Sequence, residues 1–133
     1  MDVTVSARAA ALWVALHLLL LLVLSMRVVR QRAKHKVMFG DEGAPSLTRA
    51  VRVFGNAAEY VPAGLAALVL MALVQASPLV IHVMGGGLLA GRIAHAVGLT
   101  VTDTPNPARA GGVIITWLAY IYAAVALLFY AIG

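Results

Sequence analysis

Four apolar stretches constrain the fold of this chain more than any other feature of the sequence. They span residues 9–26, 47–76, 78–99 and 109–132. A helix needs about 20 mostly apolar residues to cross the hydrocarbon core of a bilayer, so each stretch is of membrane-spanning length. Only 11% of the residues are charged, against roughly 25% in a typical soluble protein. The sequence therefore predicts an all-α, integral membrane four-helix bundle that occupies residues 1–133 as one domain.

The connections between the apolar stretches predict how the helices follow one another. Little more than Ala76-Ser77-Pro78 separates the second stretch from the third, so these two helices must form an antiparallel hairpin. Proline suits the first position of a helix, where its missing N–H leaves no hydrogen bond unmade. Residues 37–46 and 100–108 are rich in residues that favour turns, and they are the predicted loops.

The basic residues are distributed unevenly, and this asymmetry predicts the orientation in the membrane. Seven of the ten lie within residues 27–52. Arginine and lysine accumulate on the cytoplasmic side, beside anionic headgroups, so we expect both termini to be non-cytoplasmic. The net charge of +5 is thus explained without nucleic-acid binding. The first stretch carries its positive charge after the apolar core and lacks a small-residue cleavage site, which favours an uncleaved anchor over a signal peptide.

Polar residues at the start of the second stretch are the main indication of a function. Arg52, Asn56 and Glu59 fall on one helical stripe, with Tyr60 at its edge. Such groups are costly in an apolar environment unless they bind one another or a ligand. The alternative to a ligand site is a structural ion pair between neighbouring helices that involves Arg52 and Glu59.

Further ionisable residues occur at a similar depth in the third and fourth stretches. Arg92 and His95 share a face near the end of the third stretch, and Arg109 opens the fourth. Together with the second stretch, they predict a polar pocket that opens to the cytoplasmic side. Arginines outnumber carboxylates in it, which indicates an anionic ligand. For His95 the alternative is a hydrogen-bonded contact between helices.

Two other kinds of site are not predicted. The chain has no cysteine, and no pair of histidines has the i, i+4 spacing beside a carboxylate that typifies a metal site. The four-residue spacing of Gly87 and Gly91 predicts close packing of helices. These glycines do not form a phosphate-binding loop, which needs a preceding strand and a lysine.

The order and spacing of the polar residues resemble the MAPEG family, the membrane-associated proteins in eicosanoid and glutathione metabolism. The resemblance covers nearly the whole chain and rests on three motifs: Arg52-x3-Asn56-x2-Glu59-Tyr60-x-Pro62, Arg92-x2-His95 and Pro107-x-Arg109. The short loops and the abundance of alanine, valine and arginine resemble bacterial members, which implies a bacterial inner membrane.

This resemblance implies a homotrimer that binds glutathione between subunits near the cytoplasmic face. The implied glutathione-binding residues are Arg32, Arg52, Asn56, Glu59, Tyr60, Arg92 and His95. Arg109 matches the arginine that stabilises the glutathione thiolate and is the implied catalytic residue, because positive charge beside the sulfur favours its nucleophilic form. The implied activity is that of a glutathione-dependent transferase or peroxidase that acts on lipophilic electrophiles from the lipid bilayer.

One position departs from the family pattern and keeps other functions open. Several eicosanoid-type members have a tyrosine four residues after His95, where this chain has Leu99. The departure argues against a dedicated eicosanoid synthase and leaves a non-catalytic scaffold or binding protein as an alternative. A small four-helix transporter is a further alternative, although such exporters use a buried glutamate in the first span, where this chain has no carboxylate.

Overall fold

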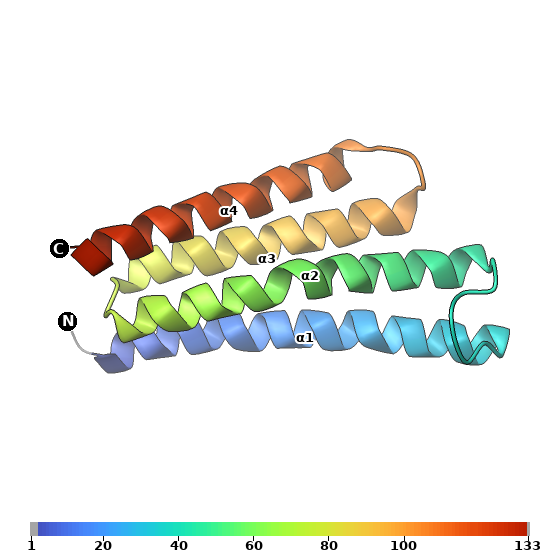
Figure 1. Ribbon diagram of the computed structural model, residues 1–133, viewed down its shortest axis with the longest axis horizontal. Helices are drawn as coiled ribbons and strands as arrows, with labels where there is room; N and C mark the ends of the chain where they lie inside the picture. Colours follow the sequence, from blue (N-terminus) through green and yellow to red (C-terminus); the bar gives the residue numbers. More distant parts are fainter. Residues whose placement is uncertain (1–2, 133) are drawn as a thin grey trace.

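The computed structural model describes residues 3–132, and within that range it contains four α-helices and no strand. The helices are α1 (Val3–His35), α2 (Pro45–Leu73), α3 (Pro78–Val101) and α4 (Pro107–Ile132). Successive helices run in opposite directions, so that α1 begins and α4 ends at the same end of the bundle (Figure 1). All four are long and apolar enough to cross a membrane. The predicted all-α membrane four-helix bundle is confirmed.

Helix α1 is longer than the span that hydropathy predicted over residues 9–26. It continues through the basic segment to His35, and the loop that follows comprises only residues 36–44. Arginine, glutamine, alanine and lysine in this segment are strong helix formers, so the helix persists where hydropathy falls. At about 1.5 Å per residue α1 is ~50 Å long, against ~30 Å for a hydrocarbon core. We therefore expect its basic end to extend into the headgroups and the water beyond them.

Proline begins three of the four helices. Pro45, Pro78 and Pro107 occupy the first positions of α2, α3 and α4. At the start of α3 the Oγ of Ser77 accepts a hydrogen bond from the N–H of Val80 at 3.4 Å. The predicted hairpin between the second and third helices is confirmed, with a helix start that a proline and an N-cap define together.

The short connection between α2 and α3 is held by bonds from the other two helices. The Ser6 hydroxyl on α1 donates to the carbonyl of Ala76 at 2.8 Å. The N–H of Ser77 donates to the hydroxyl oxygen of Tyr130 on α4 at 3.0 Å. All four elements are thus tied together at the end of the bundle where the chain begins and ends, which we call the terminal end. The opposite end, where α1 stops and α2 begins, is called the basic end.

Two apolar clusters form the core along the length of the bundle. The larger lies toward the terminal end and includes the fully buried side chains Leu68, Met71, Ile81, Met84 and Leu88. The smaller lies toward the basic end and is formed by the buried residues Leu24, Val53, Ala57 and Ala96. Among the described residues, α4 contributes none to this second cluster. Polar side chains of α2, α3 and α4 lie at that level instead.

Glycines bring α3 and α4 into close contact beside the smaller cluster. A Cβ atom added to Gly98 would lie 2.8 Å from the Cα of Arg109, and one added to Gly91 would lie 2.7 Å from the Oγ1 of Thr116. Gly112 faces the backbone of α3 in the same way. The close packing predicted around Gly91 is confirmed, and it fixes the start of α4 against the end of α3.

Candidate functional site

A cleft of about 260 Å³ opens between α2, α3 and α4 in the half of the bundle toward the basic end. Its polar lining consists of five of the predicted site residues: Arg52, Asn56, Glu59, His95 and Arg109. The i, i+4, i+7 spacing on α2 places the first three on one wall, and the other two come from α3 and α4. The structure therefore brings together residues that lie up to 57 positions apart in the sequence.

The charged residues of this cleft form no ion pair with any other residue that the structure describes. Among residues 3–132 the one ion pair joins Arg49 and Asp103, with Nη2 2.7 Å from Oδ2. Arg52 and Glu59 are exposed on a membrane-length helix, and the structural ion pair considered for them is not formed within the described chain. Two guanidinium groups and one carboxylate thus face the same space, which leaves an excess of positive charge.

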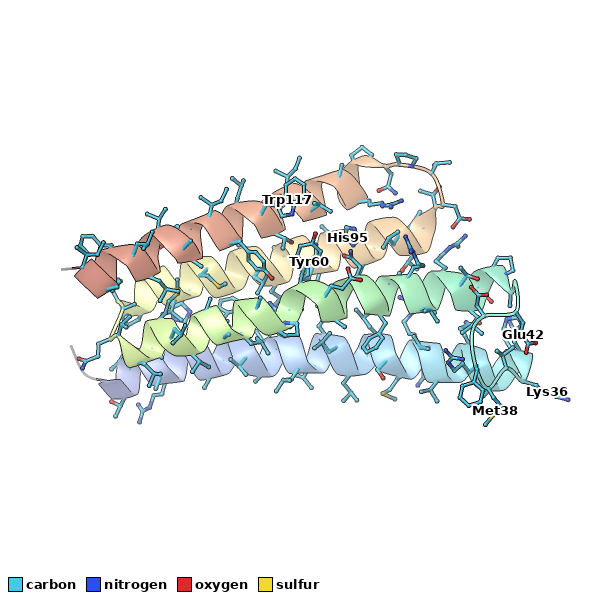
Figure 2. All side chains as sticks on the ribbon, in the orientation of Figure 1. Lys36, Met38, Glu42, Tyr60, His95 and Trp117 are labelled. Carbon is cyan, nitrogen blue, oxygen red and sulfur yellow. The ribbon has the colours of Figure 1, made fainter. Side chains whose placement is uncertain are left out.

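His95 supplies a further polar group to the same cleft. Its side chain is only 4% exposed and makes no hydrogen bond with another described residue. Figure 2 shows His95 on α3, near the middle of the length of the bundle. The alternative of a hydrogen-bonded helix contact is not observed, and the ring nitrogens remain available to a ligand.

Arg109 is positioned by a cap that joins α4 to α3. The backbone N–H of Arg109 donates to the Oδ1 of Asn106 at 3.0 Å. The Nδ2 of Asn106 donates to the carbonyl of Gly98 at 2.9 Å. The side chain of Arg109 therefore leaves the first turn of α4, where the helix dipole adds partial positive charge. Asn106 falls in the turn-rich segment predicted over residues 100–108, and an asparagine before a proline and three residues before Arg109 also has N-cap spacing.

Arg92 lies behind the cleft and does not line it. The side chain is 1% exposed. Its Nη1 donates to the Oδ1 of Asn56 at 2.7 Å, and its Nε donates to the Oγ1 of Thr116 at 3.0 Å. The guanidinium carbon stands 4.7 Å from the centroid of the Tyr60 ring, within the range of a cation–π contact. Arg92 thus orients Asn56 from α3 and ties α2 to α4.

Tyr60 belongs to this layer behind the cleft. Its ring packs against Arg92, and its carbonyl accepts a hydrogen bond from the hydroxyl of Tyr120 on α4. Thr116 is fixed in turn by donating to the carbonyl of Gly112 at 2.8 Å. Thr116 and Tyr120 are not among the site residues that the sequence predicts. Both lie on the apolar fourth helix, where one threonine and one of several tyrosines gave no distinguishing signal.

Arg32 is placed away from the cleft, at the end of α1. Its Nη1 donates to the carbonyls of Met38 and Gly40 at 3.2 and 3.0 Å, which closes the loop after α1. Figure 2 shows the neighbouring loop residues Lys36, Met38 and Glu42 at the extreme basic end of the molecule. Within one chain Arg32 therefore organises a loop. A role for it toward glutathione requires a second subunit and stays a prediction.

A second cleft, of about 390 Å³, adjoins the first toward the basic end. The two share Arg52, Leu99 and Arg109, and the second is completed by residues that include Arg49 and Asp103. Small-molecule sites occupy roughly 300–1,000 Å³, so the joined space is of a size for a short peptide. Leu99, the residue that departs from the family pattern, lies between the two parts.

Comparison with known proteins supports the resemblance drawn from the motifs. The model of the MAPEG family matches residues 10–129. Inner membrane protein YecN of Escherichia coli strain K12 is 36% identical over 121 residues, which is 91% of this chain and 91% of that protein. YecN of E. coli O6:H1 matches to the same extent. No solved structure gives a significant match. With this coverage, and with the motif residues of three helices around one cleft, the chain belongs to the MAPEG family.

Proposed function

We propose that the cleft binds glutathione and that the protein is a glutathione-dependent transferase or peroxidase for lipophilic electrophiles. The observation that carries this proposal is a group of charged side chains in one cleft, Arg52, Glu59 and Arg109, that form no ion pair among residues 3–132. Glutathione has two carboxylates, one ammonium group and a thiol. A guanidinium matches a carboxylate bidentately, and Glu59 matches the ammonium group.

Arg109 is the proposed catalytic residue. Its guanidinium and the amino end of α4 place positive charge at one point of the cleft, which favours ionisation of a thiol bound there. In the transferase reaction the thiolate sulfur forms a bond to an electrophilic carbon, and the leaving group departs with its electron pair. In the peroxidase reaction the thiolate attacks a hydroperoxide oxygen and releases the alcohol. A second glutathione then converts the sulfenic acid into disulfide and water.

The proposed location is a bacterial inner membrane. The four membrane-length helices and the printed name of the YecN relative support it. The accumulation of basic residues at the end of α1 and the start of α2 supports a cytoplasmic position for the basic end. Glutathione would then enter from the cytoplasm, and an apolar electrophile would enter from the bilayer.

We expect the protein to be a trimer in detergent and in lipid. Arg52 and Glu59 are exposed in the single chain, although α2 is a membrane-length helix. Exposing such groups to hydrocarbon costs several kcal/mol by most measures. We therefore expect a neighbouring subunit to shield them from the lipid. Native mass spectrometry should show three copies of the chain. A spectrum with only monomers or dimers under gentle detergent conditions would contradict the shared site.

Three measurements test the proposed function. The first is retention of the detergent-solubilised protein on glutathione resin, and the second is ultraviolet absorbance of the bound thiolate. The third is a turnover assay with a panel of apolar electrophiles. Binding, thiolate formation and turnover together support the enzyme. Binding without turnover supports the alternative of a non-catalytic binding protein, which the position of Leu99 in the wall of both clefts favours. Absence of glutathione binding overturns both the enzyme and the non-catalytic binding protein.

Replacing Leu99 by tyrosine is expected to strengthen glutathione binding about fivefold. A hydroxyl at this position would face the space shared by the two clefts, and a net hydrogen bond contributes roughly 1 kcal/mol. Titration calorimetry measures the change. Leu99→Phe is the matched control because it adds the ring without the hydroxyl. Equal affinities of the two variants would show that the hydroxyl finds no partner.

A further inference from the structure

A groove on the α1–α3 face of the bundle is apolar along one half and basic along the other. The apolar half has a volume of about 210 Å³, with Leu20, Leu24, Ile93 and Val97 in its lining. The basic half has a volume of about 290 Å³, with Arg30 and Arg49 in its lining. Arg27 and Thr100 line both halves, so the two are continuous. None of the residues that line this groove lines the first cleft of the proposed glutathione site, and the groove shares only Arg49 with the second cleft.

The charges in the basic half are not equivalent. Arg49 is neutralised by Asp103, and its Nη1 also donates to the carbonyl of Thr100 at 3.3 Å. Arg27 and Arg30 have no carboxylate within ion-pair distance among residues 3–132. They are spaced i, i+3 on α1, so their guanidinium groups lie on one face of the helix. Two unneutralised positive charges therefore border the groove.

Arg27 is held at the junction of the two halves. Its Nη1 donates to the Oγ1 of Thr100 at 3.2 Å, and the hydroxyl of Thr100 donates to the carbonyl of Ala96 at 2.7 Å. This single bond leaves most of the donors of the guanidinium unused. The half-buried side chain thus holds its guanidinium group in one orientation where the apolar half of the groove meets the basic half.

The geometry points to an anionic phospholipid as the occupant of this groove. We propose that the phosphodiester binds Arg27 and Arg30 and that one acyl chain lies along Leu20, Leu24 and Val97. From residue 20 to residue 30 the helix rises ~15 Å, about half of a ~30 Å hydrocarbon core, which matches the chain of one leaflet. Basic pockets between membrane helices recognise anionic headgroups in this way.

The dimensions and charge of the groove distinguish this occupant from others. A helix of another protein has a diameter of about 10 Å, which an apolar half of about 210 Å³ does not accommodate. A zwitterionic lipid carries an ammonium group beside its phosphate, and two unpaired arginines repel that group. A soluble phosphate would bind the basic half alone and leave the apolar half unused.

Native mass spectrometry with lipids of identical acyl chains tests the proposal. The wild-type protein is expected to retain phosphatidylglycerol at least about tenfold more strongly than phosphatidylcholine. The double variant Arg27→Gln/Arg30→Gln should lose this preference. Lys34→Gln/Lys36→Gln is the matched control, because it removes two charges from exposed positions outside the groove and should keep the preference. Equal retention of both lipids by the wild type, or an equal loss in the lysine control, would overturn the proposal.

A fluorescence measurement keeps the test decisive if the double variant does not fold. Val97 is 50% exposed and lines the apolar half, so Val97→Trp places a reporter in the groove while both arginines are retained. Phosphatidylglycerol with brominated chains should quench this reporter more strongly than brominated phosphatidylcholine at the same mole fraction. Equal quenching would count against a selective site. If added glycerol phosphate fully protected the reporter from quenching by the brominated lipid, the groove would be assigned to a soluble anion and the lipid assignment would be overturned.

Discussion

Replacing Arg109 by leucine is expected to reduce glutathione-dependent turnover at least ~100-fold, the usual scale for removing one preorganised charge contact from a developing anion. Arg109 enters the cleft from the capped first turn of α4, so the position of its backbone is fixed before a ligand binds. Steady-state kinetics with a soluble model electrophile measures the effect. The loss should appear in kcat and in the ultraviolet signal of the bound thiolate, while glutathione affinity changes less.

Two further variants separate the role of Arg109 from a general effect of charge. Arg8→Leu removes an exposed positive charge near the terminal end of the bundle and should leave turnover unchanged. Arg52→Leu removes a cleft arginine that we assign to binding, so it should raise KM or lower the yield of folded protein more than it lowers kcat. Full kcat in Arg109→Leu would show that another group stabilises the sulfur.

Replacing Gly112 by alanine is expected to destabilise the protein by about 1–3 kcal/mol, as overpacking of a tight interface does. The added Cβ would lie against the backbone N–H of His95, and it would also stand 2.7 Å from the carbonyl oxygen of Gly91. Backbone atoms on α3 cannot move aside as a flexible side chain does, so α3 and α4 must separate. Thermal unfolding in detergent should show a midpoint lower by roughly 5 °C or more, with turnover reduced because His95 and Arg109 move apart.

The adjacent glycine provides the control for this variant. A Cβ added to Gly111 would meet no atom within 4 Å. Alanine in place of glycine favours a helix by roughly 1 kcal/mol, so Gly111→Ala should be neutral or slightly stabilising. If both substitutions lowered the midpoint equally, the cause would be a contact with another subunit or with lipid, and the close approach of α3 to α4 would not explain it.

The sequence was sufficient for the helices because membrane spans are defined by composition and length. Hydropathy marked the apolar middle of α1 but not its basic extension, since helix formation by arginine, lysine and glutamine does not depend on hydropathy. Proline at the first position and the short link after α2 located the hairpin. These are local properties, and they do not depend on which helices are neighbours.

The candidate site was less fully predictable from the sequence. The spacing of residues along a helix gives the direction of each side chain about that helix axis, but it does not say which other helix lies on that side. The stripe from Arg52 to Glu59 identified one wall of the cleft. Arg92 and His95 lie close in angle, yet His95 faces the cleft and Arg92 faces Asn56 and Thr116 behind it. The difference depends on where α2 and α4 pack against α3, which no local spacing encodes.

The contribution of Asn106 to the site also could not be predicted from the residues next to it in the sequence. Its asparagine-proline sequence favours a turn, and a turn is what the sequence predicted for residues 100–108. The bond that matters for the site runs from its amide to the carbonyl of Gly98 on a different helix. Only the tertiary structure shows that this loop residue holds Arg109 against α3.

The depth of the cleft along the helices determines whether its ligands can enter from water or from the lipid bilayer. His95 lies six residues before the end of α3, and Arg52 lies seven residues after the start of α2. At about 1.5 Å per residue, these positions are ~10 Å inside the ends of their helices. If the helix ends lie near the membrane surface, as the proposed location implies, a site at this depth meets water on one side and the upper acyl region on the other. Under the proposed function, two electrophiles of equal reactivity would therefore be discriminated by their solubility in the bilayer before either touched the protein.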